Sequence, residues 1–258
     1  MIETVAPVEV LNAPALAGTA HGFLGRRGGV SDGLHAGLNV GLGSDDGRDA
    51  VLQNRRRAAD AVLAGAPLVT VHQIHSPDVV TVSEPWGDDA RPRADALVTR
   101  QRSVLLGILT ADCAPVLLAD REAGVIGAAH AGWRGALGGV TDATVTAMVA
   151  LGASVANIAA VVGPCIAQAS YEVDAAFEAN FVAADTYNAQ FFKLGRAGHA
   201  WFDLEGYVAT RLTAAGVGKV ERLGEDTYSQ ADRFFSFRRA THAGEPDYGR
   251  QIALIGLE

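Results

Sequence analysis

Residues 104–137, VLLGILTADCAPVLLADREAGVIGAAHAGWRGAL, decide the fold that we expect for this chain. Three apolar runs in this segment are short enough to be strands buried on both faces, at residues 105–109, 115–119 and 125–129. Residues 120–124 form a predicted turn, in which Gly124 permits a positive φ. We expect residues 110–113 and a polar loop at 130–135 to lie at strand ends, where reactive side chains are often held.

Cys113 and His130 lie at the two ends of the predicted hairpin. Because a hairpin returns the chain to its starting end, we expect these two side chains to face one another. One interpretation is a shared transition metal, above all zinc, which takes sulfur and nitrogen ligands. A second is a Cys113 nucleophile with His130 as its base. The spacing leaves a third open, in which Cys113 is a buried apolar group and His130 a hydrogen-bonded core histidine.

Residues 70–75, TVHQIH, offer a third metal ligand, since they contain His72 and His75. If residues 68–75 form a strand, alternation directs these two histidines to opposite faces of the sheet. At most one then joins the site, and the spacing does not choose between them. Three protein ligands with an open fourth position is the arrangement of catalytic zinc.

Composition favours a folded protein that acts on a small molecule. The chain has 258 residues, 49% hydrophobic and 19% charged, with a net charge of −8 and only two cysteines. Few cysteines argue against a disulfide-built secreted scaffold, and the negative charge argues against nucleic-acid binding. No apolar run approaches the roughly 18 residues of a membrane span, and no basic and apolar leader opens the sequence. We therefore expect a cytoplasmic protein without membrane contact.

Helices and strands are predicted on both sides of the central segment. The patterns favour helices at residues 49–64, 141–151, 173–182 and 203–215. They favour further strands at residues 68–74, 79–82, 96–99, 158–162, 219–223 and 252–257. Strands outnumber helices and no repeat or linker is visible, so we expect one α+β domain over residues 1–258, with mixed β-sheets flanked by helices.

Several motifs occur together along the chain. They are GRRGGVSDG at 25–33, LNVG at 38–41, QIHSPDV at 73–79, TADCAP at 110–115, HAGWRG at 130–135, GPCI at 163–166 and FFSFRR at 234–239. This set resembles the signature of the laccase-domain (YfiH-like) family. Members of that family are called multi-purpose purine nucleoside phosphorylases, polyphenol oxidases or peptidoglycan-editing factors.

The resemblance implies a layered YfiH-like sandwich and a catalytic zinc bound by His75, Cys113 and His130. His75 is chosen over His72 because it matches the histidine of the family's Gln-x-His motif. Two departures are visible: Gly25 stands where a threonine is usual, and GEDTY at 224–228 lacks the cysteine that many members carry before the threonine.

The function that the resemblance implies is a zinc-dependent purine nucleoside enzyme. Expected reactions are phosphorolysis of adenosine, inosine and methylthioadenosine to base plus ribose 1-phosphate, and deamination of adenosine; we expect a monomer. The zinc-deaminase motif H-x-E…P-C-x-x-C is absent, so deamination would need another constellation. Alternatives are a Cys113–His130 hydrolase that edits peptidoglycan precursors, a non-catalytic zinc-stabilised protein, and a copper-dependent polyphenol oxidase. The seven histidines of the chain are too few for the histidine-rich copper clusters of a multi-copper oxidase.

Candidate substrate-binding residues are Arg134, Arg55 and Asn39; Arg55 and Arg26 are weaker phosphate candidates than Arg134. Arginine forks suit phosphate, and Arg134 closely follows His130 in the sequence. Arg55, Arg56 and Arg57 are consecutive on a predicted helix and point about 100° apart, so one of them can face a pocket while the others are solvated. Asn39 would bind a ribose hydroxyl or a base edge, or hold a turn. A surface-charge role is the alternative for each arginine.

Two carboxylates are candidate general bases or orienters of a histidine, Asp95 and Asp112. The alternative for each is a carboxylate that caps a turn, and we prefer that interpretation for Asp95. Cys165 is interpreted as a packing residue.

Overall fold

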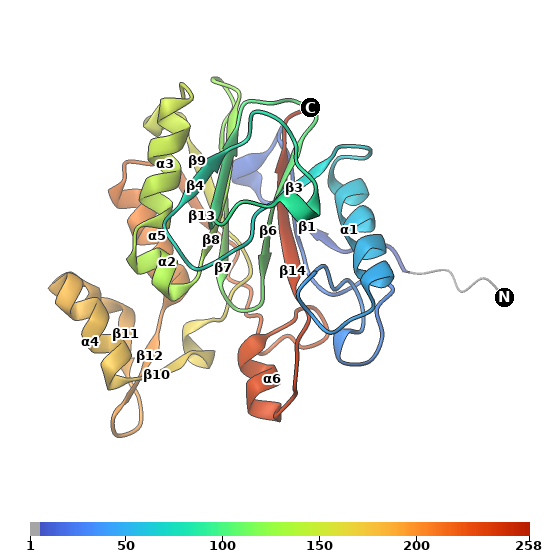
Figure 1. Cartoon of the computed structure of the whole chain (residues 1–258). Helices are drawn as coiled ribbons and strands as arrows, with labels where there is room; N and C mark the ends of the chain where they lie inside the picture. Colours follow the sequence, from blue (N-terminus) through green and yellow to red (C-terminus); the bar gives the residue numbers. More distant parts are fainter. Residues whose placement is uncertain (1–5) are drawn as a thin grey trace.

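Two β-sheets lie face to face in the centre of the molecule (Figure 1). The computed structural model describes residues 6–258; the opening residues, on which the expectation about a leader rests, lie outside this range. The first sheet has the order β1 (Val10–Leu11), β2 (Ala20–Leu24), β14 (Gln251–Gly256), β6 (Leu105–Thr110) and β3 (Leu68–Thr70). The second has the order β13 (Lys219–Arg222), β9 (Ala159–Val162), β7 (Ala114–Asp120), β8 (Val125–Ala131), β5 (Ala96–Thr99) and β4 (Val79–Thr81).

Both sheets mix parallel and antiparallel pairs, and helices cover their outer faces. On the first sheet lies α1 (Arg48–Val62); on the second lie α2 (Trp133–Leu137), α3 (Val140–Ala150) and α5 (Leu204–Ala214). A third, small sheet has the order β10 (Glu172–Asp174), β12 (His199–Phe202) and β11 (Phe192–Leu194), with α4 (Ala175–Ala184) beside it and α6 (Phe237–Ala243) later in the chain. The predicted α+β architecture of mixed sheets flanked by helices is confirmed.

The central strands are buried on both faces, as their continuous apolar sequence predicts. In β7, Val116 and Leu118 pack toward the helices of the second sheet, while Leu117 and Ala119 pack against the first sheet. The same alternation holds in β14, where Ile255 packs between the sheets. Removing one such leucine from water stabilises the fold by roughly 2 kcal/mol, so this core fixes the two sheets relative to one another.

Three local predictions were wrong at their ends. The predicted loop 130–135 contains the start of α2, and the predicted helix 173–182 begins as strand β10. Helix α4 starts only at Ala175 because the Asp174 carboxylate accepts a hydrogen bond from the backbone N–H of Phe177, which caps the helix there. The predicted strand 68–74 ends at Thr70. No described helix is long and apolar enough to cross a bilayer. The single domain, the monomeric state and the cytoplasmic location stay predictions.

Candidate active site

The β7–β8 hairpin brings Cys113 and His130 together. Its register pairs Pro115 with His130, and Cys113 directly precedes β7 at the same end. His75 enters from the loop after β3, and its Nε2 lies 3.9 Å from the Cys113 Sγ. One ligand atom from each of the three residues lies within 4.8 Å of the others. We call His75, Cys113 and His130 the ligand triad.

A single buried carboxylate holds both histidines of the triad. Oδ1 of Asp95 lies 2.7 Å from Nδ1 of His130, and because a carboxylate only accepts, this nitrogen carries the proton and Nε2 is left as the ligand atom. Asp95 also accepts from the backbone N–H groups of Ile74, His75 and Ser76 at 2.7–3.0 Å. It thereby holds His75 at a φ of 61°. The interpretation of Asp95 as a turn cap is incomplete, since the residue also orients a ligand.

The loop that carries His75 leaves the sheet early. Because β3 ends at Thr70, strand alternation does not govern His72 and His75. The Gln73 side chain instead bonds both backbone groups of Leu109, with its amide donating at 2.7 Å and its carbonyl accepting at 2.9 Å. His72 lines the same hollow as the triad but is not one of the three clustered ligands, and His75 is the histidine that the structure brings to Cys113.

The charges of the triad are strongly coupled. Burial opposes ionisation of the Cys113 thiol, but His130 and His75 outweigh burial and lower its pKa to about 7. Burial likewise opposes a charge on His130, but the Cys113 sulfur and Asp95 raise its pKa to about 9. Desolvation also acts on Asp95, yet its bonds from His130 and the backbone lower its pKa to about 2. The site therefore favours a thiolate beside protonated imidazole, and a divalent cation would replace that proton.

The donor set fits zinc. One sulfur and two imidazole nitrogens are the ligands that zinc takes tetrahedrally, and three protein donors leave one position open. Gly132 leaves the space for them: a methyl group at this position would lie 2.8 Å from Cδ2 of His75 and 2.9 Å from Sγ of Cys113. The residue at 132 must therefore lack a side chain for the triad to converge.

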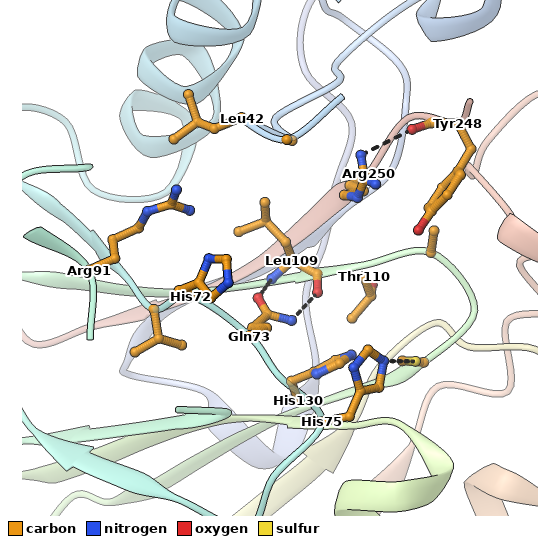
Figure 2. A pocket seen from close by; sticks show the side chains of 15 residues that line it. Leu42, His72, Gln73, His75, Arg91, Leu109, Thr110, His130, Tyr248 and Arg250 are labelled. Carbon is orange, nitrogen blue, oxygen red and sulfur yellow. Dashed lines mark hydrogen bonds between the residues drawn. The ribbon is translucent and has the colours of Figure 1, made fainter. Parts of the chain in front are cut away.

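A hollow of about 380 Å³ opens beside the triad, and we call it the arginine-lined hollow (Figure 2). Arg91 and Arg250 lie in its wall; His72 lies between Arg91 and the ligand histidines, and Arg250 lies beside Tyr248 on another side of the hollow. Nε of Arg91 donates to the backbone oxygen of Asp88, and the Arg250 guanidinium lies 4.3 Å above the ring of Tyr248. These contacts fix each arginine while leaving further N–H donors of each guanidinium for a ligand.

A second hollow, of about 230 Å³, adjoins the triad, and we call it the aromatic hollow. The rings of Trp133, Tyr171 and Phe237 line it together with Arg238. It shares His75 and Cys113 with the arginine-lined hollow. The triad therefore lies between a cationic hollow and an aromatic one.

Asp112 supports the turn between the two sheets. It has a φ of 84° and is buried, and it accepts hydrogen bonds from the hydroxyls of Thr227 and Ser236 and from the backbone N–H of Arg238. Burial raises the pKa of this carboxyl above its ordinary value, against the effect of these bonds. With three donors on its oxygens, Asp112 anchors the late segment of the chain beside Cys113.

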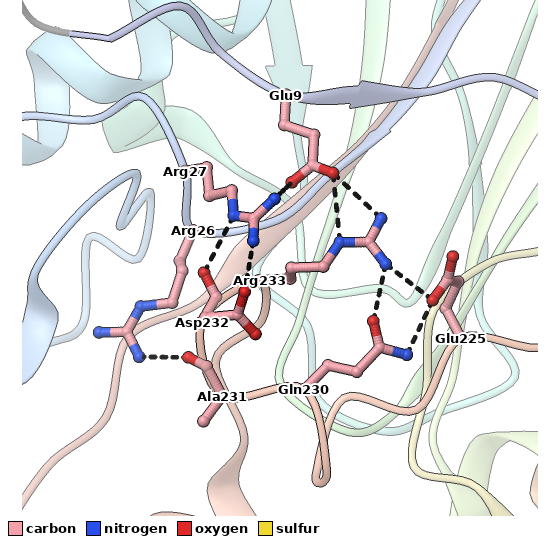
Figure 3. A network of polar contacts seen from close by, with 8 residues as sticks. All are labelled: Glu9, Arg26, Arg27, Glu225, Gln230, Ala231, Asp232 and Arg233. Carbon is pink, nitrogen blue, oxygen red and sulfur yellow. Dashed lines mark hydrogen bonds and ion pairs between the residues drawn. The ribbon is translucent and has the colours of Figure 1, made fainter.

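Two predicted phosphate ligands lie outside both hollows. Arg134 is exposed, and its guanidinium lies 4.9 Å from the centre of the Trp133 ring. Arg26 donates to the backbone oxygens of Ala36 and Ala231, and Figure 3 shows it within the polar network that joins the early chain to residues 225–233. Their proximity in sequence to the motifs does not place them at the site.

Arg55 and Asn39 are buried within the fold. Arg55 donates to Asp88 at 2.7 Å and lines neither triad hollow. Asn39 is fully buried; its carbonyl accepts from the backbone N–H groups of Gly41 and Arg250, and its amide donates to two further side chains. No capacity is left for a ribose hydroxyl, so Asn39 positions the wall of the arginine-lined hollow instead of binding substrate directly.

The sequence profile described as multi-copper polyphenol oxidoreductase laccase matches residues 20–258. The chain belongs to this laccase-domain, YfiH-like family. A relative named purine nucleoside phosphorylase, from Deinococcus radiodurans, is 44% identical over 98% of this chain and 95% of its own length. Purine nucleoside phosphorylase YfiH from Escherichia coli is 34% identical over 90% of this chain and 91% of its own.

Two solved structures share the whole fold. The crystal structure of the Bacillus licheniformis hypothetical protein YfiH has a TM-score of 0.88 at 26% identity, covering 100% of this chain and 98% of that one. YlmD from Geobacillus stearothermophilus has a TM-score of 0.87 at 29% identity, covering 99% of this chain and 98% of that one. The resemblance seen in the motifs is confirmed for the family and its fold.

Proposed function

We propose that this laccase-domain protein is a zinc-dependent purine nucleoside phosphorylase, which converts adenosine, inosine and methylthioadenosine to the free base and a ribose 1-phosphate. The observation that carries the proposal is the convergence of His75, Cys113 and His130 beside a hollow that holds two arginines. The relatives from Deinococcus radiodurans and Escherichia coli, which are named purine nucleoside phosphorylases, support the same reaction class.

Phosphate would be bound by Arg91 and Arg250. Guanidinium groups bind phosphate oxygens through paired N–H donors. The whole chain carries a net charge of −8, so two arginines in one hollow concentrate positive charge where an anion must bind. The glycine-containing segment at residues 41–43 also lines this hollow and allows close approach of a ligand to the backbone.

Zinc would be held by the ligand triad, and when bound it supplies a Lewis acid and lowers the pKa of a coordinated water. The chain contributes the orientation. Asp95 keeps the proton on Nδ1 of His130, which directs Nε2 of that ring to the site. The hydrogen bonds from Ile74, His75 and Ser76 to Asp95 hold the loop of the other histidine against the same carboxylate.

We propose adenosine deamination as a second reaction of this site. The observation that favours it is the three-donor set, whose open position suits water next to a substrate ring. Release of ammonia from adenosine in phosphate-free buffer separates deamination from phosphorolysis. Ammonia release that persists when Cys113 is replaced by Ala would contradict a role for the triad.

The main test is phosphate-dependent release of hypoxanthine from inosine by the purified protein. We expect about one zinc per chain, and loss of both zinc and activity in Cys113→Ala. Cys165→Ala is the matched control, because Cys165 is buried and lines neither hollow, and it should retain zinc and activity. Phosphate-independent turnover, or full activity in Cys113→Ala, would overturn the proposal.

The alternatives give different results in the same preparation. A zinc-free protein that is inactivated by thiol alkylation supports a Cys113–His130 hydrolase acting on peptidoglycan precursors. Copper-dependent oxidation of a phenol supports a polyphenol oxidase. Within residues 6–258, the triad is the one cluster of three such side chains placed to hold a metal ion, which favours a mononuclear site over a multi-copper one.

A further inference from the structure

The two hollows form one groove that passes the ligand triad. Both are lined by His75, Ala111 and Cys113. Tyr248 belongs to the arginine-lined hollow and Phe237 to the aromatic hollow, and their rings pack edge to face with centroids 5.0 Å apart. The wall is therefore continuous from one hollow to the other.

The two ends of the groove differ in the way that phosphorolysis requires. A phosphate oxygen forms a bond to the anomeric carbon of the sugar while the bond from that carbon to the base nitrogen breaks. The electron pair of the broken bond leaves with the base, which takes up the proton that the attacking hydrogen phosphate loses. Because the entering oxygen and the departing nitrogen lie on opposite sides of the carbon, phosphate and base need two separate subsites. Arg91 and Arg250 place two cations at one end, whereas the other end has a single arginine, Arg238, beside three aromatic rings.

The aromatic hollow has the chemistry of a subsite for a flat heteroaromatic ring. Tyr171 and Trp133 offer ring surfaces, and Phe237 is 50% exposed although the neighbouring Phe234 and Phe235 are buried. A half-exposed phenylalanine at a hollow gains apolar burial when a planar ligand covers it. Burial raises the pKa of Tyr171 above its ordinary value, so its hydroxyl stays protonated at neutral pH.

Arg238 adds a fixed polar group to this hollow. Its guanidinium lies 5.0 Å from the centre of the Tyr171 ring, and its Nη1 donates to the backbone oxygen of Glu172 at 2.7 Å. Its backbone N–H donates to Asp112. The residue is thus held at both ends, with further N–H donors available to the edge of a base.

We propose that the aromatic hollow is the purine subsite, in which the base lies against Phe237 and Tyr171 while phosphate occupies the arginine-lined hollow. This assignment rests on the proposed function. The sugar then bridges the two hollows past the ligand triad. Specificity for the base comes from the aromatic hollow, and affinity for phosphate comes from the other.

The test compares matched apolar truncations at the two ends. Zinc-loaded wild type, Phe237→Ala and Leu42→Ala are titrated with inosine and with hypoxanthine in a calorimeter; Leu42 lines the arginine-lined hollow. We expect Phe237→Ala to weaken binding of both ligands at least 10-fold, and Leu42→Ala to change hypoxanthine affinity less than 3-fold. Where turnover is measured, the KM for inosine should rise in Phe237→Ala while the KM for phosphate stays constant.

The outcomes separate this inference from the proposed function. Hypoxanthine binding that depends on Phe237, in a protein without phosphorolysis, upholds the purine subsite and overturns the proposed reaction. A larger loss of hypoxanthine affinity in Leu42→Ala than in Phe237→Ala places the base in the arginine-lined hollow. That result overturns the purine subsite but not the proposed reaction. Absence of binding of both ligands to the zinc-loaded wild type overturns it as well.

Discussion

His130 depends on a carboxylate that lies 35 residues earlier in the chain. Asp95 is fully buried, and it bonds the ring of His130 and the backbone of the loop that carries His75. Hydrogen-bonded partners of metal ligands fix the ring orientation and tautomer. Asp95 is therefore a positioning residue for two ligands at once.

Replacing Asp95 by Asn should weaken zinc binding by about 10–100-fold, because the neutral amide no longer matches the Nδ1–H of His130 and the three backbone donors. Zinc affinity is measured by competition with a chromophoric chelator, alongside thermal unfolding of the metal-free protein. Asp78→Asn, an exposed carboxylate close by, is the control and should bind zinc like the wild type. Equal zinc affinity in Asp95→Asn and Asp78→Asn would contradict the positioning role of Asp95.

Arg91 is the residue whose loss should act on phosphate alone. Arg91→Ala removes a cation from the arginine-lined hollow, so we expect the KM for phosphate to rise by about 10-fold or more, a loss of about 1.4 kcal/mol. Arg134→Ala is the control, since that exposed side chain lines neither hollow. Steady-state kinetics with varied phosphate measure the KM for phosphate in both variants. A raised KM in Arg134→Ala, with an unchanged KM in Arg91→Ala, would support Arg134 as the phosphate ligand and contradict the role of Arg91.

At the scale of elements, the turn 110–113 carries the chain from one sheet to the other. Strand β6 pairs within the first sheet, whereas β7 begins the hairpin of the second. The reactive end of the hairpin therefore lies between the two sheets, and the packing of β7 against the first sheet fixes Cys113.

Leu117→Ala should destabilise the protein by about 2–5 kcal/mol, because Leu117 is fully buried between the sheets and truncation leaves a cavity. Urea unfolding measures the change from the midpoint and slope. Leu194→Ala is the control: Leu194 is 96% exposed, so its truncation should change the free energy of unfolding by less than about 0.5 kcal/mol. Similar losses in both would show that the packing between the sheets does not limit stability.

At the scale of the whole molecule, distant segments are joined through Asp226, in the GEDTY segment that departs from the family pattern. Its carboxylate accepts from the backbone N–H groups of Ala167 and Tyr228 and from the hydroxyl of Ser170. Burial opposes its charge, but these bonds outweigh burial and lower its pKa below the ordinary value.

A lowered pKa means that Asp226 stabilises the fold above the pKa of an unfolded aspartate, about 3.9, and that this contribution is lost as the pH falls through the lower folded value. Asp226→Asn should therefore reduce the unfolding temperature by several degrees at pH 6, and the difference from wild type should shrink below about pH 4. Thermal scans between pH 3 and 6 test this. Asp232→Asn, at a side chain that is 71% exposed, should show little change. If the difference in unfolding temperature between Asp226→Asn and the wild type does not change with pH, the stabilising role of the ionised Asp226 carboxylate is contradicted.

Local patterns in the sequence were sufficient for the central strands and for the hairpin at whose end Cys113 and His130 lie. Continuous apolar runs predict strands buried on both faces, and a tight turn at 120–124 leaves the chain only one direction in which to return. The choice of His75 over His72 came from the motif resemblance and not from alternation, which does not apply because β3 ends at Thr70.

Only the tertiary structure decided what surrounds the triad. Arg91 is far in the sequence from Phe237 and Arg250, and no local periodicity relates the three. Arg134 is near His130 in the chain yet lies outside both hollows, since helix α2 turns its side chain to solvent. Periodicity and turns act over a few residues, whereas a binding groove arises where packed sheets bring distant loops to one edge.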